Sequence, residues 1–141
     1  MTGATVRRRV YLDDIDGFGM LHHSRYLVLV DRAIIDYWHE LGWRTDEGPS
    51  VQAIREVTIT FHAPVTGICD VDIRFWIASL GLSSIVYAFQ IHNVHNQVLY
   101  AEGQRVLVNL DRRTLRPRPL SDEDRRRAEP LCATNRTVER E

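Results

Sequence analysis

The sequence predicts an α+β fold in which one amphipathic helix packs on an antiparallel sheet. The first observation is a stretch with apolar residues at three- and four-residue spacing, which is typical of an amphipathic helix. The second is a set of later stretches in which apolar and polar residues alternate, which indicates strands. The third is a length of 141 residues with 44% hydrophobic side chains, which suits one domain with one core. One helix covers only part of one face of such a sheet, so we expect the domain to pair with another copy.

The first third of the chain predicts a strand, a loop and the helix. Residues 6–12 are rich in β-forming side chains, and residues 13–23 contain two glycines and several polar groups. The helix follows, with Ser24 as its predicted N-cap and Gly42 as its predicted stop. Its apolar stripe consists of Tyr26, Val30, Ala33, Ile34, Tyr37, Trp38 and Leu41. Because other apolar residues lie outside this stripe, we expect a long helix that is buried on most sides.

The remainder of the chain predicts four strands, which we expect to form an antiparallel meander. They cover residues 51–62, 70–79, 83–92 and 98–110. Turn signals separate them, namely Pro64 with Gly67, then Gly81, then residues 93–96. Ser121 is the predicted cap of a short charged helix. We assign residues 1–128 to the domain and residues 129–141 to a polar tail that we expect to be flexible.

Composition narrows the setting and the partners. A net charge of -1 argues against nucleic acid or an anionic membrane as a partner. No apolar run is long enough to span a bilayer, and residues 1–9 lack the apolar core of a signal peptide. Cys69 and Cys132 show no pairing pattern, so we expect a reducing, cytoplasmic location. The histidines and acidic residues show no recognised ligand spacing, so we predict neither a metal site nor a cofactor.

The loop before the helix carries a motif that resembles a known family. The segment reads Asp16-Gly17-Phe18-Gly19-Met20-Leu21-His22-His23-Ser24-Arg25-Tyr26. Further matching segments are Gly81-Leu82-Ser83-Ser84, Ala101-Glu102-Gly103, residues 106–111 and Arg116-Pro117-Arg118-Pro119. In this order they are similar to the 4-hydroxybenzoyl-CoA thioesterase family of hotdog-fold enzymes. The resemblance spans residues 6–120 and implies a hotdog fold, with the sheet wrapped around one long central helix.

The resemblance also implies an activity and a set of site residues. The activity is hydrolysis of an acyl thioester carried by CoA or by an acyl-carrier protein, in polyketide or fatty-acid metabolism. Asp16 would act as the nucleophile or as the general base, two routes that the sequence leaves open. The backbone N–H of His23, with that of Ser24 nearby, would form the oxyanion hole at the helix N-terminus. The substrate-binding residues would be Gly17, Phe18, Gly19, Met20, Leu21, Tyr26, Ser83 and Ser84, and the assembly a homodimer or homotetramer.

Each of these residues also has a plainer interpretation. An Asp before Gly is common in turns, so Asp16 could be a turn carboxylate, and Asp13 and Asp14 could be solvated charges. His23 could orient substrate or be an ordinary loop histidine, and Tyr26 could simply pack in the core.

The roles of two further segments are undecided, and two alternative functions remain. The hydroxyls of Ser83 and Ser84 could satisfy local backbone at a strand start. The arginines of residues 112–118 could bind CoA phosphates or form a solvated surface. A hotdog dehydratase, which would pair a histidine with a carboxylate, and a non-catalytic binding protein are the alternative functions.

Overall fold

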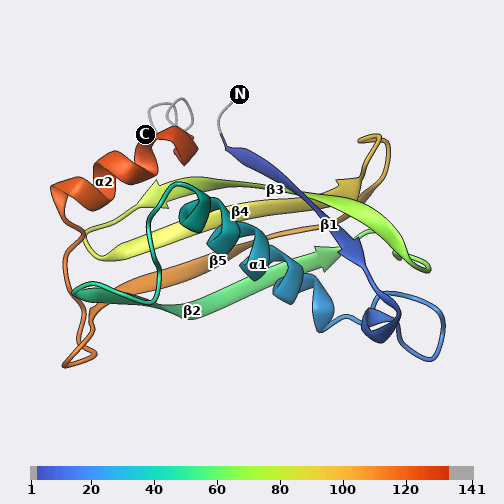
Figure 1. Cartoon of the computed structure of the whole chain (residues 1–141), viewed down its shortest axis with the longest axis horizontal. Coiled ribbons are helices and arrows are strands. Elements are labelled where there is room, and N and C mark those ends of the chain that lie inside the picture. The colour runs from blue at the N-terminus through green and yellow to red at the C-terminus, as the bar shows by residue number, and fades with distance from the viewer. Residues whose placement is uncertain (1–2, 134–141) are drawn as a thin grey trace.

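The computed structural model describes residues 3–133 as a five-stranded antiparallel sheet with a helix lying across one face (Figure 1). In chain order the elements are β1 (Ala4–Val10), a 3-10 turn (Leu12–Asp14), α1 (Arg25–Glu40), β2 (Ser50–Phe61), β3 (Cys69–Leu80), β4 (Ser84–Asn93), β5 (Leu99–Asp111), α2 (Asp122–Ala128) and a second 3-10 turn (Glu129–Leu131). The predicted α+β class and all five strands are therefore observed. No helix among the described residues is long and apolar enough to cross a membrane.

The strand order differs from the predicted meander. Across the sheet the order is β1-β3-β4-β5-β2, so only β3, β4 and β5 follow one another as a meander. β2 pairs with β5 at one edge, and β1 pairs with β3 at the other edge. The connection at residues 62–68 must therefore cross three strand spacings, roughly 14 Å. Seven residues can extend about 23 Å, so the crossing is within reach, and nothing in the local pattern reveals it.

α1 buries one side against the sheet and leaves the other side exposed. Its buried residues are Tyr26, Leu29, Val30, Ala33 and Ile34. They face a core that includes Phe75 and Phe89, and α1 packs mainly on β1 and β3. The helix has 16 residues, and Arg32 and Ile35 on its other side are exposed. The predicted burial on most sides is therefore wrong for the single chain, because nothing within residues 3–133 covers that side.

The ends of the helices follow the capping signals only in part. Gly42 adopts a φ of +86° and donates its N–H to the carbonyl of His39, so it ends α1 as predicted. Ser121 accepts a hydrogen bond from the N–H of Asp124 and caps α2. Ser24 occupies the N-cap position of α1 as predicted, but it has helical dihedral angles and its side chain makes no capping hydrogen bond.

The chain continues as part of the fold beyond residue 128. Leu131 is fully buried, and the N–H of Ala133 donates to the carbonyl of Ile77 on β3. The predicted boundary at residue 129 therefore falls too early, because an apolar side chain in an otherwise polar segment anchors the second 3-10 turn. The rest of the predicted tail, residues 134–141, lies outside the described residues.

Candidate active site

The loop that leads into α1 folds into a tight turn around Asp16. Carboxylate oxygen Oδ1 of Asp16 accepts hydrogen bonds from the N–H of Phe18 at 2.8 Å and from the N–H of Met20 at 3.1 Å. The backbone N–H of Asp16 donates to the carbonyl of Met20 at 2.7 Å. Gly19 sits between them with a φ of +80°, which favours glycine. The side chain of Asp16 is therefore held in one orientation by its own loop.

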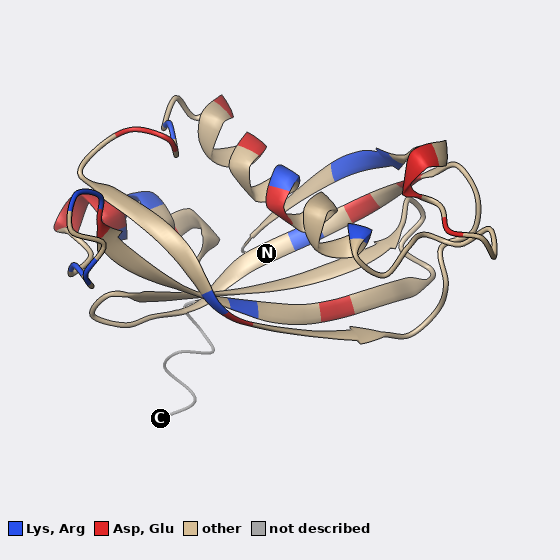
Figure 2. Ribbon diagram, turned by 90° about the horizontal axis from the view of Figure 1, so that it is seen from below, with Lys and Arg blue, Asp and Glu red and all other residues tan. Residues whose placement is uncertain are grey.

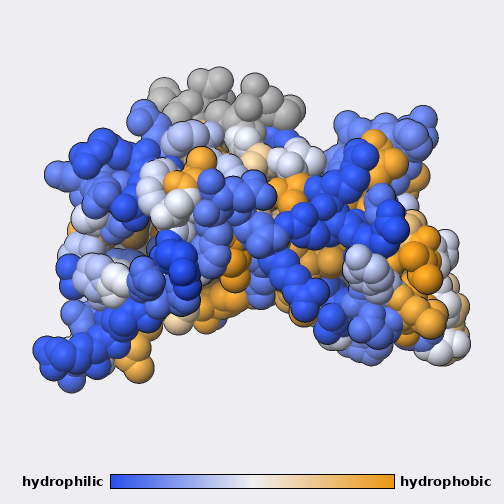
Figure 3. All heavy atoms as spheres, viewed as in Figure 1, coloured by the Kyte–Doolittle hydropathy of each residue, from blue (hydrophilic) through white to orange (hydrophobic). Residues whose placement is uncertain are grey.

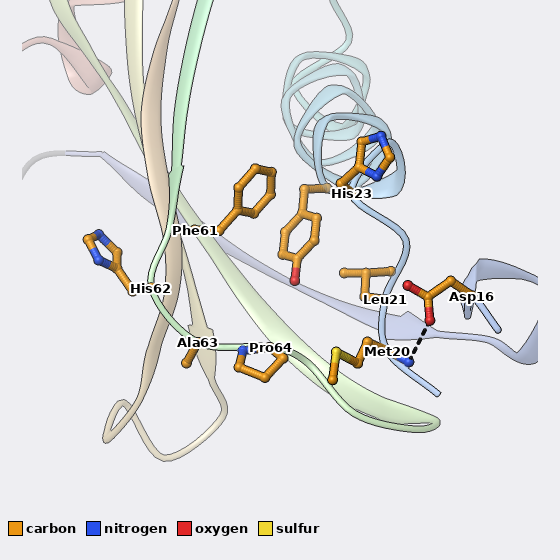
Figure 4. A pocket seen from close by; sticks show the side chains of 9 residues that line it. Asp16, Met20, Leu21, His23, Phe61, His62, Ala63 and Pro64 are labelled. Carbon is orange, nitrogen blue, oxygen red and sulfur yellow. Dashed lines mark hydrogen bonds between the residues drawn. The ribbon is translucent and has the colours of Figure 1, made fainter. Parts of the chain in front are cut away.

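The surroundings of Asp16 keep its carboxylate charged. The two backbone N–H donors hold the pKa of Asp16 below its ordinary value, and its electrostatic interactions with His22 and His23 act in the same direction. The second oxygen accepts no hydrogen bond from residues 3–133 and points to the side of the loop where Leu21 lies (Figure 4). One oxygen thus serves the turn, and the other is available to a ligand.

A pocket of about 320 Å³ opens beside Asp16 (Figure 4). It is lined by Asp16, Met20, Leu21, His23, Tyr26, Phe61, His62, Ala63 and Pro64. The loop and the first turn of α1 form one wall, and the crossing connection after β2 forms the other. The two walls are joined where the N–H of Leu21 donates to the carbonyl of Val65 at 2.8 Å. The pocket therefore depends on the strand order, because β2 at the edge sends its connection past this loop.

The start of α1 has one backbone donor beside the pocket without an acceptor among the described residues. The N–H of Ser24 donates to Nδ1 of His22 at 3.1 Å, and the Ser24 hydroxyl lies 2.8 Å from the same nitrogen. The N–H of Arg25 donates to the carbonyl of His22. No acceptor among the described residues takes the N–H of His23, whose ring stacks on that of His22 and lines the pocket. Of the two predicted oxyanion donors, the structure leaves His23 open and occupies Ser24.

The loop residues predicted to bind substrate divide into two groups. Met20, Leu21 and Tyr26 line the pocket. Phe18 is 86% exposed at the loop tip, and Gly17 and Gly19 are exposed and do not line the pocket. These three residues shape the loop around Asp16 and do not form a wall of the pocket.

Ser83 and Ser84 lie at the far end of the sheet from the pocket. Ser84 pairs with Val108 on β5, whereas Phe61 at the pocket pairs with Ala101. Seven positions along one strand correspond to roughly 23 Å. The structure therefore does not bring these serines to Asp16 within one chain. The backbone carbonyl of Ser83 accepts from the N–H of Asn109, so Ser83 anchors the start of β4 through its backbone.

The sequence interpretation missed the wall that follows β2. Phe61 packs edge-on against Tyr26, with ring centroids 4.9 Å apart and an interplanar angle of 72°. Burial raises the pKa of the Tyr26 hydroxyl, and the negative charge of Asp16 acts in the same direction. His62 points away from the pocket in Figure 4 and pairs with Glu102 at 2.9 Å. The sequence did contain a signal for this wall, because Phe61 is an aromatic residue at the end of a predicted strand, on the same face as Ile59.

The neighbouring charges are largely structural. Asp14 is buried rather than solvated: it pairs with Arg25 at 2.9 Å and accepts the N–H of Tyr11. Arg112 donates to the carbonyls of Gly48 and residue 50, so it braces the start of β2. The remaining arginines of that segment lie at the end of the molecule near α2, opposite the acidic 3-10 turn next to Asp16 (Figure 2). A CoA phosphate bound there would be remote from Asp16 of the same chain.

Comparisons with known proteins identify the family of this chain. The family model of the thioesterase superfamily matches residues 18–100, beginning two positions after Asp16. The acyl-CoA thioester hydrolase YbgC of Escherichia coli is 27% identical over 115 residues, which cover 79% of this chain and 85% of the relative.

Solved structures share the architecture. The DHNA-CoA thioesterase of Staphylococcus aureus superposes with a TM-score of 0.83 at 17% identity, covering 100% of this chain and 97% of the other. The PA5185 protein of Pseudomonas aeruginosa superposes with a TM-score of 0.85 at 23% identity, covering 93% and 92%. Among thioesterases this arrangement of sheet and helix is the hotdog fold, as the sequence motifs implied, but the long central helix that they also implied is not confirmed. The chain therefore belongs to the thioesterase superfamily and is a thioester hydrolase.

Proposed function

We propose that this chain hydrolyses acyl thioesters of CoA or of an acyl-carrier protein at the pocket beside Asp16. The observation that carries the proposal is the charged carboxylate of Asp16, with one oxygen held by two N–H groups and the other facing the pocket. The name of YbgC, an acyl-CoA thioester hydrolase, supports CoA as the carrier. The walls formed by Met20, Leu21, Tyr26 and Phe61 suit an apolar acyl group.

The free oxygen of Asp16 supports two chemical routes. As a nucleophile it attacks the thioester carbon, the thiolate leaves, and water then hydrolyses the mixed anhydride to regenerate the carboxylate. As a general base it takes a proton from water, which attacks the same carbon and expels the thiol. In both routes the thioester oxygen gains negative charge in the transition state. The open N–H of His23 is the proposed donor to that oxygen, close to the positive end of α1.

Ser24 has a secondary place in this proposal. Its N–H already donates to His22, so it reaches the developing oxyanion only if that hydrogen bond opens. We therefore assign the main stabilisation to His23.

The proposed active form is at least a homodimer. Within residues 3–133 the outer edge of β2 pairs with no other strand, although the strand has 12 residues. A long open edge invites pairing with a second chain. Antiparallel pairing of two β2 edges would bring the Ser50 end of one copy beside the Phe61 end of the other. The partner's copies of Ser83 and Ser84 would then lie near this pocket, which gives those residues a role in substrate binding.

The dehydratase alternative has less support than hydrolysis. Dehydration would need a histidine paired with a carboxylate in the pocket; Asp16 and His23 both line it, but no hydrogen bond or ion pair is observed between them. Asp31 pairs with Arg105 and Asp36 pairs with Arg8. The His62–Glu102 pair exists, but His62 points away from the pocket (Figure 4).

The test is thiol release from a panel of aromatic, short-chain, long-chain and β-keto acyl-CoAs by the wild type and by Asp16→Asn. Asparagine keeps an oxygen that accepts the N–H groups of Phe18 and Met20, so the loop is expected to hold its shape. We expect kcat/KM to fall about 10²- to 10⁴-fold, the range typical of losing a general base. Both proteins are prepared with Cys69 and Cys132 replaced, because their thiols would add to the thiol signal of the assay.

The matched control is Asp13→Asn, which changes an exposed aspartate of the same loop. It is expected to retain wild-type turnover. Near-normal activity of Asp16→Asn on every ester that the wild type hydrolyses would contradict the assignment of Asp16.

A further inference from the structure

A buried arginine lies beneath α1 and has no role in the chemistry described above. Arg105 on β5 has a side chain that is only 6% exposed, and it forms an ion pair with Asp31 of α1. Its guanidinium also lies over the ring of Tyr87, 5.8 Å from the centroid. The Nε–H of Arg105 has no hydrogen-bond acceptor among the described residues. A buried donor without a partner is unfavourable, and in native proteins such a donor often has a water molecule, an ion or a functional role to account for it.

Arg105 faces the same side of the sheet as the pocket. It pairs with Val57 on β2, four positions from Phe61 at the pocket, which is roughly 13 Å along the strand. On α1, Asp31 lies five residues after Tyr26, about 7.5 Å along the helix axis. The ion pair between Arg105 and Asp31 therefore lies beyond the pocket, toward the C-terminal end of α1 and toward the N-terminal end of β2.

An apolar strip connects the pocket to this ion pair. It consists of Phe61, Ile59 and Val57, which occupy alternate positions of β2 on the face toward α1. Phe61 is 48% exposed and the other two are half-buried, because α1 packs on β1 and β3 at the other side of the sheet. Figure 3 shows apolar side chains at the surface beside α1. The Asp31 side chain is 44% exposed and the Arg105 side chain 6%, so a ligand reaches the guanidinium only when the side chains over it shift.

We propose that the acyl group of the substrate lies along this apolar strip and that Arg105 donates a hydrogen bond to an oxygen in its distal part. The inference rests on the proposed function and adds a substrate class to it. The substrate is an acyl thioester of medium length with a hydroxyl or keto oxygen far from the thioester carbon. The planar guanidinium is held by Asp31 and by the Tyr87 ring, so its free N–H is oriented before the ligand arrives.

The neighbouring carboxylate selects a neutral oxygen over a second anion. Asp31 already balances the charge of Arg105, and a distal carboxylate on the acyl group would be placed against Asp31 in partly buried surroundings. Two neighbouring carboxylates repel each other. Arg105 therefore favours a hydroxyl or keto acyl group, whereas Asp31 disfavours a dicarboxylic one.

The first experiment compares decanoyl-CoA with 10-hydroxydecanoyl-CoA, in hydrolysis and in the binding of their non-hydrolysable thioether analogues. We expect the wild type to prefer the hydroxylated acyl group about tenfold in kcat/KM and in Kd, as for one hydrogen bond to a charged donor. Arg105→Met is expected to abolish that ratio, and Arg105→Lys to reduce it. An equal ratio in wild type and Arg105→Met would overturn the proposal.

The second experiment uses a variant at a half-exposed position, so that it does not depend on the folding of a core variant. Asp31→Asn removes the repelling charge and keeps an oxygen for Arg105. We expect it to raise kcat/KM and binding for the thioester of decanedioic acid relative to decanoyl-CoA about tenfold. No rise would contradict the predicted selection by charge.

The two proposals fail in different ways. If the wild type hydrolyses no acyl-CoA of the panel, the proposed function fails for CoA thioesters, and the binding ratio of the thioether analogues still decides the role of Arg105. If hydrolysis depends on Asp16 but no variant changes the preference for a distal oxygen, only the inference about Arg105 is wrong.

Discussion

At the scale of single residues, Asp16 combines two roles that the sequence analysis treated as alternatives. Its Oδ1 makes the turn that an Asp-Gly sequence predicts, and its other oxygen faces the pocket. The turn also lowers the pKa of the carboxyl, so the reactive group is charged near neutral pH. The structural role therefore supports the proposed chemical one, because the same hydrogen bonds orient the carboxylate and keep it ionised.

The lowered pKa of Asp16 predicts the acid limb of the pH profile. The active form is the carboxylate, so kcat/KM falls only as the pH drops through the pKa of the free enzyme. Because that pKa is lowered, the limb is expected below the ordinary aspartate value of about 3.9, and kcat/KM is not expected to decline between about pH 5 and pH 7. The measurement is kcat/KM against pH, with circular dichroism at each pH to confirm folding. An acid limb near pH 6 would indicate a histidine in place of Asp16.

At the scale of elements, the ladder between β2 and β5 holds one wall of the pocket in place. Gly103 on β5 lies so close to β2 that an added Cβ would be 2.0 Å from the carbonyl oxygen of Thr58 and 2.9 Å from the ring of Phe89. The sequence motif containing Gly103 thus has a structural explanation in close packing. Further along the same ladder, Phe61 and the crossing connection reach the loop of Asp16.

This close approach predicts that Gly103→Ala destabilises the protein. The added methyl group must displace backbone on β2, and overpacking of a well-packed region typically costs about 1–3 kcal/mol. The free energy of unfolding in urea measures the effect. Gly17→Ala is the matched control, since its Cβ would meet nothing within 4 Å, and it is expected to unfold at the wild-type midpoint. Equal midpoints for both variants would contradict the packing argument.

At the scale of the whole molecule, the edge of β2 and surfaces next to it remain open. The outer edge of β2, the exposed side of α1 and the apolar strip between them are uncovered within residues 3–133. A second copy paired through β2 would cover this edge and bring Ser83 and Ser84 of the partner toward the pocket. Dimerisation would then complete both the fold and the proposed substrate site.

Val57→Pro tests pairing through the β2 edge. The backbone of Thr58 faces β5, as its close approach to Gly103 shows, so the polar groups of Val57 point outward. Proline is tolerated where the missing N–H faces solvent, but it blocks the addition of a strand. We expect a folded monomer by light scattering, with reduced turnover, whereas Val57→Ala stays oligomeric. A Val57→Pro variant with wild-type mass and activity would exclude β2 as the interface.

Local sequence determined the elements of this protein and the loop that holds its reactive carboxylate. The apolar period of 3.6 placed α1, Gly42 ended it, and alternation placed the strands. The Asp16 turn follows from residues within four positions of one another, so it too was open to prediction. These features depend on hydrogen bonds and side-chain spacing between near neighbours, which a single sequence displays directly.

Only the tertiary structure decided how those elements are arranged around the site. The position of β2 beside β5, the pocket wall from Phe61 to Pro64 and the distance of Ser83 from Asp16 all depend on pairing between strands far apart in the chain. The burial of Arg105 beneath α1 has the same origin. An alternating strand fits either edge of a sheet equally well. The choice is made by the reach of connections and the burial of whole faces, which no local pattern encodes.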